Sequence, residues 1–308
     1  MSVPPDLHDL VIRTMAEYLV GWNLTLDTLQ RVNSRFYQLR LIFIGQVNLS
    51  HYASHWVYKH RPYGWNTVQS MTLYYCPDIS DVSALGRVRD LSLSLCDNIR
   101  DISALSRIYC LEINDCRRLT DISALTGIHT LTIRDCPRIT DVSALGRVRI
   151  LSLMHCPNIS DVSALGGVHV LSLNSCSSIR DVSALSGVHC LHLYRCDGIS
   201  DVSALGGVYS LSIHYCPNIL DISGLRGVCR LELYWCRGIR DVSALGGLYY
   251  LEITYCHGIS DVSALGGVHI LRLYFCDGLV DTDISSLQTV PDLTIHHCPG
   301  ISDVQRKN

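Results

Sequence analysis

Twelve cysteines stand in one register of the sequence, and a regular column of thiols could hold metals or carry redox chemistry. The first eleven lie 20 residues apart and the last step is 22 residues: Cys76, Cys96, Cys116, Cys136, Cys156, Cys176, Cys196, Cys216, Cys236, Cys256, Cys276 and Cys298. A disulfide framework shows irregular spacings in a short secreted chain. The fixed period instead indicates that cysteine occupies one column of a repeat. The neighbouring columns are Leu, Ile and Val, so we expect buried, protonated thiols that donate weakly to backbone carbonyls.

Aspartate forms a second column, from Asp81 to Asp281 at 20-residue spacing and then Asp303, which could be taken for a cation ladder. Calcium needs several oxygen ligands per ion, whereas each unit offers one Asp and one Ser. We expect these carboxylates to accept hydrogen bonds from the start of a tight turn, Asp101 from the amide of Ser103 or Ala104.

Two histidine clusters, His296-His297-Cys298 and His189-Cys190-x-His192, suggest zinc. Strand alternation predicts that His296 and His297 point to different sides, and Cys298 belongs to the inward column. Ser, His and Asp recur in repeat columns rather than converging on one point. We therefore expect no catalytic residues, no metal and no cofactor. An enzyme that uses the cysteine column is the alternative.

Composition excludes several classes of protein. The 308 residues are 48% hydrophobic and 17% charged with a net charge of −3, which excludes a disordered chain and gives no reason to expect nucleic acid as a partner. The longest near-apolar run, Leu39 to Val47, is interrupted by Arg40, Gly45 and Gln46, so no membrane contact is expected. The first residues show no secretory signal.

The 20-residue period, which starts at Met71, predicts a solenoid. Leu91 and Leu93 alternate with serines, as in a short strand with one buried face. The pattern Val88-x-x-Leu91-x-Leu93-x-x-Cys96-x-x-Ile99 resembles the leucine-rich repeat, and the Asp-Val-Ser-Ala-Leu segment is similar to the convex side of bacterial internalins. The resemblance implies an α/β solenoid of about 12 turns over residues 71–304, a horseshoe or arc with a parallel sheet on its concave face, followed by a tail at 305–308.

Variation concentrates at the second, fourth and fifth positions of each unit, which line the concave face in leucine-rich repeats. They are small or charged in the early units and become aromatic from Tyr194 onward. Aromatic residues with Arg are the usual composition of protein-binding hot spots, although cross-strand aromatic pairs can also simply stabilise a sheet. The expected partner-binding residues are Tyr194, Arg195, His214, Tyr215, Tyr234, Trp235, Tyr255, Arg272, Tyr274 and Phe275.

The first 70 residues lack the period. Apolar spacing predicts helices over residues 9–20 and from Leu26 to about Leu41. The stretch from Leu7 to Leu19 and the element Val32-Asn-Ser-Arg-Phe36 resemble the F-box, which assigns residues 1–45 to an F-box-like helical domain and 46–70 to a linker and N-terminal cap. In this cap, Val47 and Leu49 form a candidate degenerate repeat. The resemblance implies that a helical adaptor or the F-box core contacts Leu7, Val11, Ile12, Met15, Leu19, Leu26, Leu29, Val32 and Phe36.

An F-box followed by leucine-rich repeats resembles the substrate receptors of SCF-type cullin–RING ubiquitin ligases. This implies a Skp-type adaptor and cullin complex as partners, a protein substrate on the repeats, and no chemistry by the receptor itself. The alternative is a leucine-rich binding scaffold without a ligase, whose N-terminal helices are only a cap. Free thiols favour the cytosol or nucleus, of a eukaryotic cell or of a virus-infected host cell.

Overall fold

The computed structural model describes residues 45–50, 68–279, 284–299, 301 and 304–307. The chain divides into two compact units, Met1–Arg138 and Ile139–Asn308. No helix among the described residues combines the length and the apolar character that crossing a bilayer requires. The expected helices and all nine expected adaptor-facing residues, from Leu7 to Phe36, lie outside the described residues.

Each repeat folds as one short strand followed by one tight turn, because only one side of the 20-residue unit is apolar. In the unit that begins at Leu151, the buried side chains recur at a fixed spacing and are at most 1% exposed: Leu151, Leu153, Cys156, Ile159, Val162, Leu165 and Val168. The same columns are buried in the neighbouring units, so the core continues from turn to turn. This arrangement is the leucine-rich-repeat fold that the sequence predicts.

The first compact unit, Met1–Arg138, contains five described strands that pair in parallel, in chain order. Two described turns are 3-10 helices on the side opposite the strands. The elements are β1 (Gly45–Ser50), β2 (Val68–Tyr74), β3 (Asp90–Ser94), β4 (Cys110–Asn114), β5 (Thr130–Arg134), η3 (Ser83–Leu85) and η4 (Ser103–Leu105). β1 pairs in parallel with β2, with Val47 opposite Met71 and Leu49 opposite Leu73 in the register.

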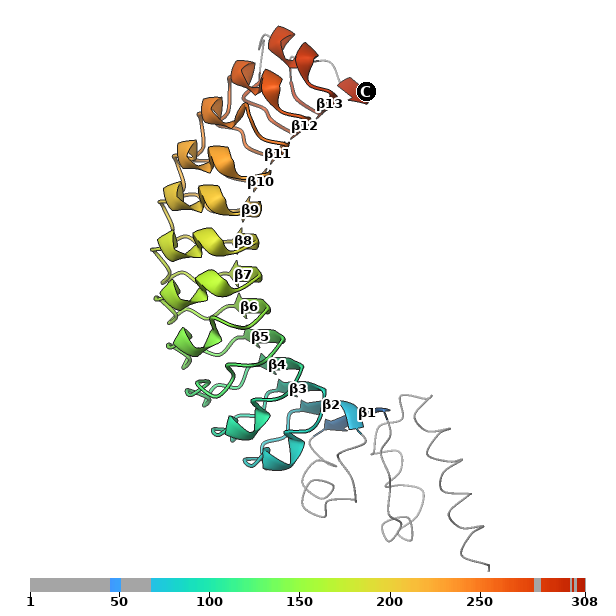
Figure 1. Ribbon diagram of the computed structural model, residues 1–308, viewed down its shortest axis with the longest axis vertical. Helices are drawn as coiled ribbons and strands as arrows, with labels where there is room; N and C mark the ends of the chain where they lie inside the picture. Colours follow the sequence, from blue (N-terminus) through green and yellow to red (C-terminus); the bar gives the residue numbers. More distant parts are fainter. Residues whose placement is uncertain (1–44, 51–67, 280–283, 300, 302–303, 308) are drawn as a thin grey trace, which may run out of the picture. The chain divides into compact units, whose positions relative to one another are not determined.

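The second compact unit, Ile139–Asn308, continues the same pattern of strands and turns. Its strands line the inner side of the curved stack and its 3-10 turns line the outer side (Figure 1). The strands are β6 (Ile150–Met154), β7 (Val170–Asn174), β8 (Cys190–Tyr194), β9 (Ser210–His214), β10 (Arg230–Tyr234), β11 (Tyr250–Thr254), β12 (Ile270–Tyr274), β13 (Asp292–His296) and β14 (Val304–Lys307). The turns are η5 (Ser143–Leu145), η6 (Ser163–Gly167), η7 (Ser183–Gly187), η8 (Ser203–Gly207), η9 (Ser223–Gly227), η10 (Ser243–Leu245), η11 (Ser263–Gly267) and η12 (Ser285–Thr289).

Two expectations need correction. The described residues contain no α-helix, so the α/β description does not hold for the repeats: a strand of five residues in a 20-residue unit leaves room only for 3-10 turns of three to five residues. The expected tail at 305–308 is also wrong, since β14 pairs antiparallel with β13, with Asp292 opposite Lys307. This reversed strand covers the last edge of the sheet, which would otherwise present unpaired backbone groups.

The aspartate column caps the turns, as expected. The amide of Ser163 donates to Oδ1 of Asp161 at 2.8 Å, and the same bond recurs from Ser103 to Asp101 at 2.9 Å. The hydroxyl of Ser163, and then its amide, lower the pKa of Asp161 below its ordinary value of 3.8. Within the described residues, each carboxylate from Asp81 to Asp261 therefore has a local structural role.

Stability should fall on acidification through this column. A carboxyl group whose pKa is lowered by folding stabilises the fold above its ordinary pKa, and that contribution is lost as the pH falls below about 3.8 toward the folded value. We expect the triple variant Asp161→Asn, Asp181→Asn and Asp201→Asn to keep the acceptor oxygen and to show a shallower loss of unfolding free energy between neutral and acidic pH. Urea unfolding at several pH values measures this. The prediction would be contradicted if the unfolding free energy of the triple variant fell with pH as steeply as that of the wild type.

Candidate protein-binding face

A residue with left-handed backbone directly follows each strand from β2 to β13. It is the fifth position of the unit, where φ is 55° at Tyr215, 54° at Trp235, 56° at Tyr255 and 52° at Phe275. This conformation is uncommon for a bulky residue and costs about 1–3 kcal/mol. It is held by a hydrogen bond to the next strand, such as that from the amide of Tyr215 to the carbonyl of Tyr234 at 2.9 Å. The turn directs the following cysteine inward and leaves the fifth side chain beside the fourth.

Two adjoining rows of side chains result on the sheet face of the second unit. The first row comes from the fourth position and consists of Tyr194, His214, Tyr234, Thr254, Tyr274 and His296. The second row comes from the fifth position and consists of Arg195, Tyr215, Trp235, Tyr255, Phe275 and His297. We call them the first row and the second row, and together the aromatic face.

The second row is a continuous stack. The ring centroids of Tyr215 and Trp235 are 5.9 Å apart, those of Trp235 and Tyr255 5.2 Å, and those of Tyr255 and Phe275 4.6 Å. The stack ends with His297, 4.7 Å from Phe275. At the other end the guanidinium of Arg195 lies 5.4 Å from the Tyr215 ring. Because neighbours cover the faces of these rings, the stack presents mainly ring edges outward.

Edge-to-face contacts join the two rows. Tyr215 meets the edges of Tyr194 at 5.3 Å and of Tyr234 at 5.4 Å, and Tyr234 meets Tyr255 at 5.5 Å. Such pairs are the favoured geometry of aromatic rings. The structure thus brings nine of the ten expected partner-binding residues into one surface, half-buried except for the exposed Arg195.

Arg272 is the exception. It is at the second position of its unit, outside both rows, and its Nη2 bonds Oδ2 of Asp292 at 2.8 Å while Nη1 donates to the Asp292 carbonyl at 3.1 Å. Its guanidinium is only partly exposed. Arg272 is therefore engaged in holding β12 to β13.

Two carboxylates lie beside the aromatic face. Glu232 and Glu252 occupy the second position of neighbouring strands and face each other in register. Burial raises the pKa of Glu232, but hydrogen bonds from Arg230 and Ser212 outweigh it and the pKa ends below its ordinary value. Burial lowers the pKa of nearby His214. Glu232 is thus a charged group already paired with Arg230, at 2.6 Å.

The histidine pair at the end of the face departs from the expected alternation. The rings of His296 and His297 are 6.4 Å apart, because the left-handed φ of 54° at His297 replaces the regular strand geometry that would have separated them. The thiol of Cys298 is directed inward, 3.6 Å from the carbonyl of His296. Over the described ranges, no three metal-ligating side chains gather at one point.

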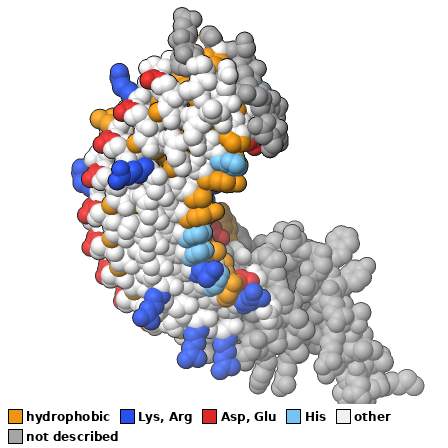
Figure 2. Space-filling model, turned by 45° about the horizontal axis from the view of Figure 1, so that its top comes forward, with side chains coloured by type: hydrophobic (Ala, Val, Ile, Leu, Met, Phe, Trp, Pro, Cys, Tyr) orange, Lys and Arg blue, Asp and Glu red, His pale blue; other side chains and the backbone are white. Residues whose placement is uncertain are grey.

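Sequence reasoning missed a second aromatic column, at the residues that precede the strands. His169 stacks on His189 at 4.7 Å and His189 on Tyr209 at 4.7 Å, and Tyr249 stacks on His269 at 4.9 Å. Figure 2 shows hydrophobic and histidine side chains aligned in a column of this kind. The signal was available, since the nineteenth position of most units is Tyr, His or Arg, but the motif of the resembled family gives that position no role.

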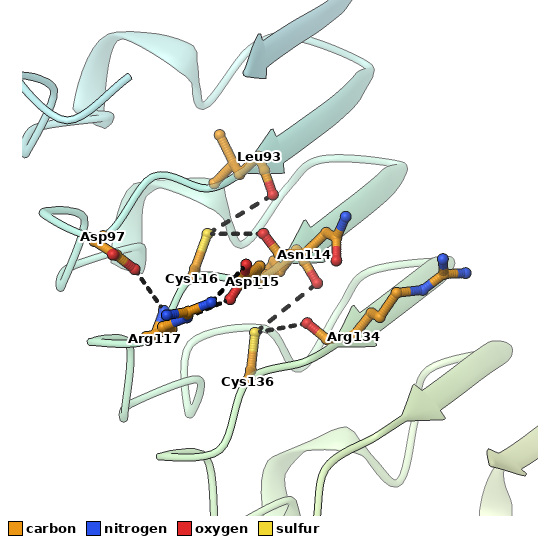
Figure 3. Close-up of polar contacts among 9 residues, drawn as sticks. Leu93, Asp97, Asn114, Asp115, Cys116, Arg117, Arg134 and Cys136 are labelled. Carbon is orange, nitrogen blue, oxygen red and sulfur yellow. Dashed lines mark hydrogen bonds and ion pairs between the residues drawn. The ribbon is translucent and has the colours of Figure 1, made fainter. Parts of the chain in front are cut away.

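The cysteine column lies in the core. The thiol of Cys116 donates to the carbonyls of Leu93 at 3.7 Å and Asn114 at 3.6 Å (Figure 3), and Cys196 repeats this with Leu173 at 3.3 Å and Tyr194 at 3.6 Å. Burial raises the pKa of Cys116 to about 11 and that of Cys196 to about 12. No disulfide joins cysteines among the described residues. The thiols thus act as buried donors between successive turns.

Alkylation of the native protein should therefore be selective. We expect iodoacetamide at pH 8 to label the half-buried Cys110, Cys190 and Cys229 first, and the core column only after denaturation, because the thiolate is the nucleophile. Peptide mass spectrometry over time measures this. Rapid labelling of Cys196 in the folded protein would contradict a structural role and favour the redox alternative.

Comparisons with known proteins found partial similarity to several solved structures. No protein-family model matches the chain, and no curated protein matches it significantly. The internalin InlF of Listeria monocytogenes is similar over 76% of this chain and 82% of its own, with 21% identity and a TM-score of 0.49. The functional domain of InlJ from the same species, which includes a cysteine ladder, is similar over 74% and 62%, with 17% identity and a TM-score of 0.37. A leucine-rich-repeat protein of Leptospira interrogans is similar over 76% and 85%, with 10% identity and a TM-score of 0.30. The assignment of the repeat fold rests on the strand register and buried columns described above.

Proposed function

We propose that the protein is a binding scaffold that holds another protein on the aromatic face of its second unit. The observation that carries this proposal is the double row of rings on the outward side of strands whose apolar core is already complete on the other side. Half-buried tyrosine, tryptophan and arginine are the residue types that dominate binding energy at protein interfaces. Stacked rings that present their edges and hydroxyl groups suit a protein surface better than a flat ligand, which would need an open ring face.

A display experiment tests this proposal. Peptides selected from a random library on the full-length protein should include a group that loses binding when Tyr215 and Tyr255 are both replaced by alanine. Fluorescence anisotropy with synthetic copies of the selected peptides measures the affinity. If all selected peptides bind the double variant as tightly as the wild type, the aromatic face is not the binding surface.

We further infer from the F-box resemblance of residues 1–45 that this scaffold serves as the substrate receptor of an SCF-type ubiquitin ligase. In this proposal the N-terminal helices bind a Skp-type adaptor and the cullin complex, while the aromatic face holds the substrate. The support is the sequence pattern from Leu7 to Phe36. The protein would raise the concentration of its substrate beside the ligase and carry out no chemistry itself.

Binding of the full-length chain to a purified Skp-type adaptor tests the ligase role. We expect a complex at micromolar concentration or below, weakened by Val11→Asp together with Met15→Asp on the first predicted helix. Circular dichroism of the variant separates loss of binding from loss of the repeat fold. If no complex forms, the ligase role is wrong and the scaffold function stands without it.

A further inference from the structure

The side of the second unit from which the chain enters the strands carries arginine and histidine but no carboxylate. This side consists of the last five residues of each 20-residue repeat, from 146–150 to 266–270, and we call it the basic flank. It contains four arginines and three histidines and no Asp or Glu: Arg147, Arg149, Arg226, Arg230, His169, His189 and His269. In a protein with a net charge of −3, the basic flank is a local excess of the opposite sign.

Four of these residues lie on three consecutive turns, and all four are exposed. Arg147 and Arg149 belong to the first turn, His169 to the next and His189 to the one after it. The amide of His169 donates to the carbonyl of Arg149 at 3.1 Å. The rings of His169 and His189 are stacked, with centroids 4.7 Å apart and planes inclined by only 3°. We call these four residues the basic patch.

The side chains of the basic patch keep their hydrogen-bond donors available. Within the described residues, the two arginines form no ion pair and the two imidazole rings form no hydrogen bond. Arg230, farther along the basic flank, differs in this respect because it pairs with Glu232 at 2.6 Å. Positive groups gathered without a counter-charge repel one another, so a bound anion would stabilise the basic patch.

The stacked imidazoles resist protonation in the free protein. Desolvation in the stack, then the charge of Arg149 and then that of His189, lower the pKa of His169 below its ordinary value of 6.5. Of the other charged or titratable groups that face the pair from neighbouring flank and strand positions, none is a carboxylate: they are Arg147, Cys190, His192 and Tyr209. A carboxylate supplied by a partner would favour the charged imidazoles, so its binding and proton uptake would reinforce each other.

We propose that the basic patch binds an acidic segment of a partner protein, and that His169 and His189 make this binding tighter on acidification. The two arginines hold carboxylates at every pH through charge-assisted N–H bonds, and the imidazoles add charged donors once they are protonated. Aspartate stays ionised until the pH falls to about 4, so the gain appears before the segment loses its charge. This site is separate from the aromatic face and goes beyond the binding function proposed above.

The observations favour a protein segment over a nucleic acid. Single-stranded nucleic acids bind open ring faces on which bases can stack, but the rings of His169, His189 and Tyr209 cover one another. Figure 2 also shows acidic side chains along the outer edge of the stack of turns, which would repel a backbone charged along its whole length. A protein segment can instead present a few carboxylates at one place.

Fluorescence anisotropy of the full-length protein with a labelled hexa-aspartate peptide tests the proposal. We expect binding that is about tenfold tighter at pH 5.5 than at pH 7.5, and no binding of a hexa-asparagine peptide. Arg147→Gln with Arg149→Gln should weaken binding about tenfold at both pH values. His169→Gln with His189→Gln should keep the affinity at pH 7.5 within about twofold of the wild type and remove the gain at pH 5.5.

Arg180→Gln with Arg240→Gln is the matched control. Both residues are exposed arginines at the tenth position of their repeats, beside the aspartate column, so the control removes the same charge elsewhere. It should leave the affinity within about twofold of the wild type. A loss equal to that of the Arg147 and Arg149 variant would mean general attraction by charge and would overturn the site. Thermal unfolding of each variant guards against loss of fold.

Two further outcomes would overturn the proposal. One is no binding of hexa-aspartate, or binding that is indifferent to all changes in the basic patch. The other is tighter binding of a dodecathymidine oligonucleotide, weakened by the same variants, which would make the ligand a nucleic acid. The aromatic face is judged separately, because Tyr215→Ala with Tyr255→Ala should bind hexa-aspartate as tightly as the wild type.

Discussion

Replacement of Trp235 by alanine should lower the affinity for a ligand of the aromatic face by about 30-fold or more, since central tryptophans at interfaces commonly contribute 2 kcal/mol or more. Trp235 stacks between Tyr215 and Tyr255, and its ring also meets the edge of His257 at 5.8 Å and the guanidinium of Arg237 at 4.7 Å. Its removal therefore deletes one surface of the ligand site and loosens the rings on both sides. Anisotropy or calorimetric titration with a selected peptide measures the loss.

Tyr209→Ala is the control for this prediction. Tyr209 is 51% exposed and aromatic, but it belongs to the column that precedes the strands and stacks on His189. Its replacement should leave the affinity within about twofold of the wild type, because contacts outside the centre of an interface contribute little. Equal losses from the two variants would mean that the column before the strands, and not the aromatic face, contacts the ligand.

Leu205→Ala should destabilise the protein by about 2–5 kcal/mol, the range found when a buried leucine is truncated in a core that cannot collapse around the gap. Leu205 is 0% exposed in η8, and its backbone is held on both sides by bonds to Val202 and Val208 at 3.0 Å. The corresponding leucines of the adjacent units, Leu185 and Leu225, are also 0% exposed. Urea unfolding followed by circular dichroism measures the change.

The repeat supplies a matched control for that truncation. Leu220 is 62% exposed on the connection that precedes η9, and Leu220→Ala should change the unfolding free energy by no more than about 0.5 kcal/mol. Because each turn contacts only its neighbours, Leu205→Ala should also weaken the coupling between the turns on either side of it and lower the cooperativity of unfolding. Comparable losses from the two leucines would contradict the assignment of Leu205 to the core.

Periodicity alone was sufficient to predict the interior of this fold. Leu153, Cys156 and Ile159 recur with their spacing unchanged, and each is 0% exposed, because one strand and one turn per 20 residues can bury only one such set. The role of Asp161 followed from the short reach of its side chain to the amide of Ser163. These features depend on contacts that are local or repeated, which a sequence pattern expresses directly.

The geometry of the face was less predictable. Nothing in the sequence marks the left-handed backbone at Trp235 or Tyr255, since glycine, the usual signal, is absent from that column. From the sequence, the fourth and fifth residues of each repeat therefore looked like alternating strand positions. On that basis the side chains of His296 and His297 were expected to point to different sides. The left-handed conformation arises from a hydrogen bond between this residue and the next strand, which is a contact between neighbouring 20-residue repeats. β14 was missed for a related reason, because its pairing depends on an open sheet edge rather than on the pattern of residues 304–307.

From β6 to β12 each strand residue pairs with the residue 20 positions further along the chain, and this register has a consequence for how the array can change in length. Loss or gain of one whole 20-residue segment, for example by unequal recombination between neighbouring copies, rejoins equivalent points of two turns and leaves every buried column continuous. Such an event would shift Thr254 and Glu252 as a block with their neighbours when it occurs upstream, and would delete them cleanly when it includes their own turn. Residues of the aromatic face, and with them its binding specificity, can thus be gained or lost one turn at a time while the buried columns stay unchanged.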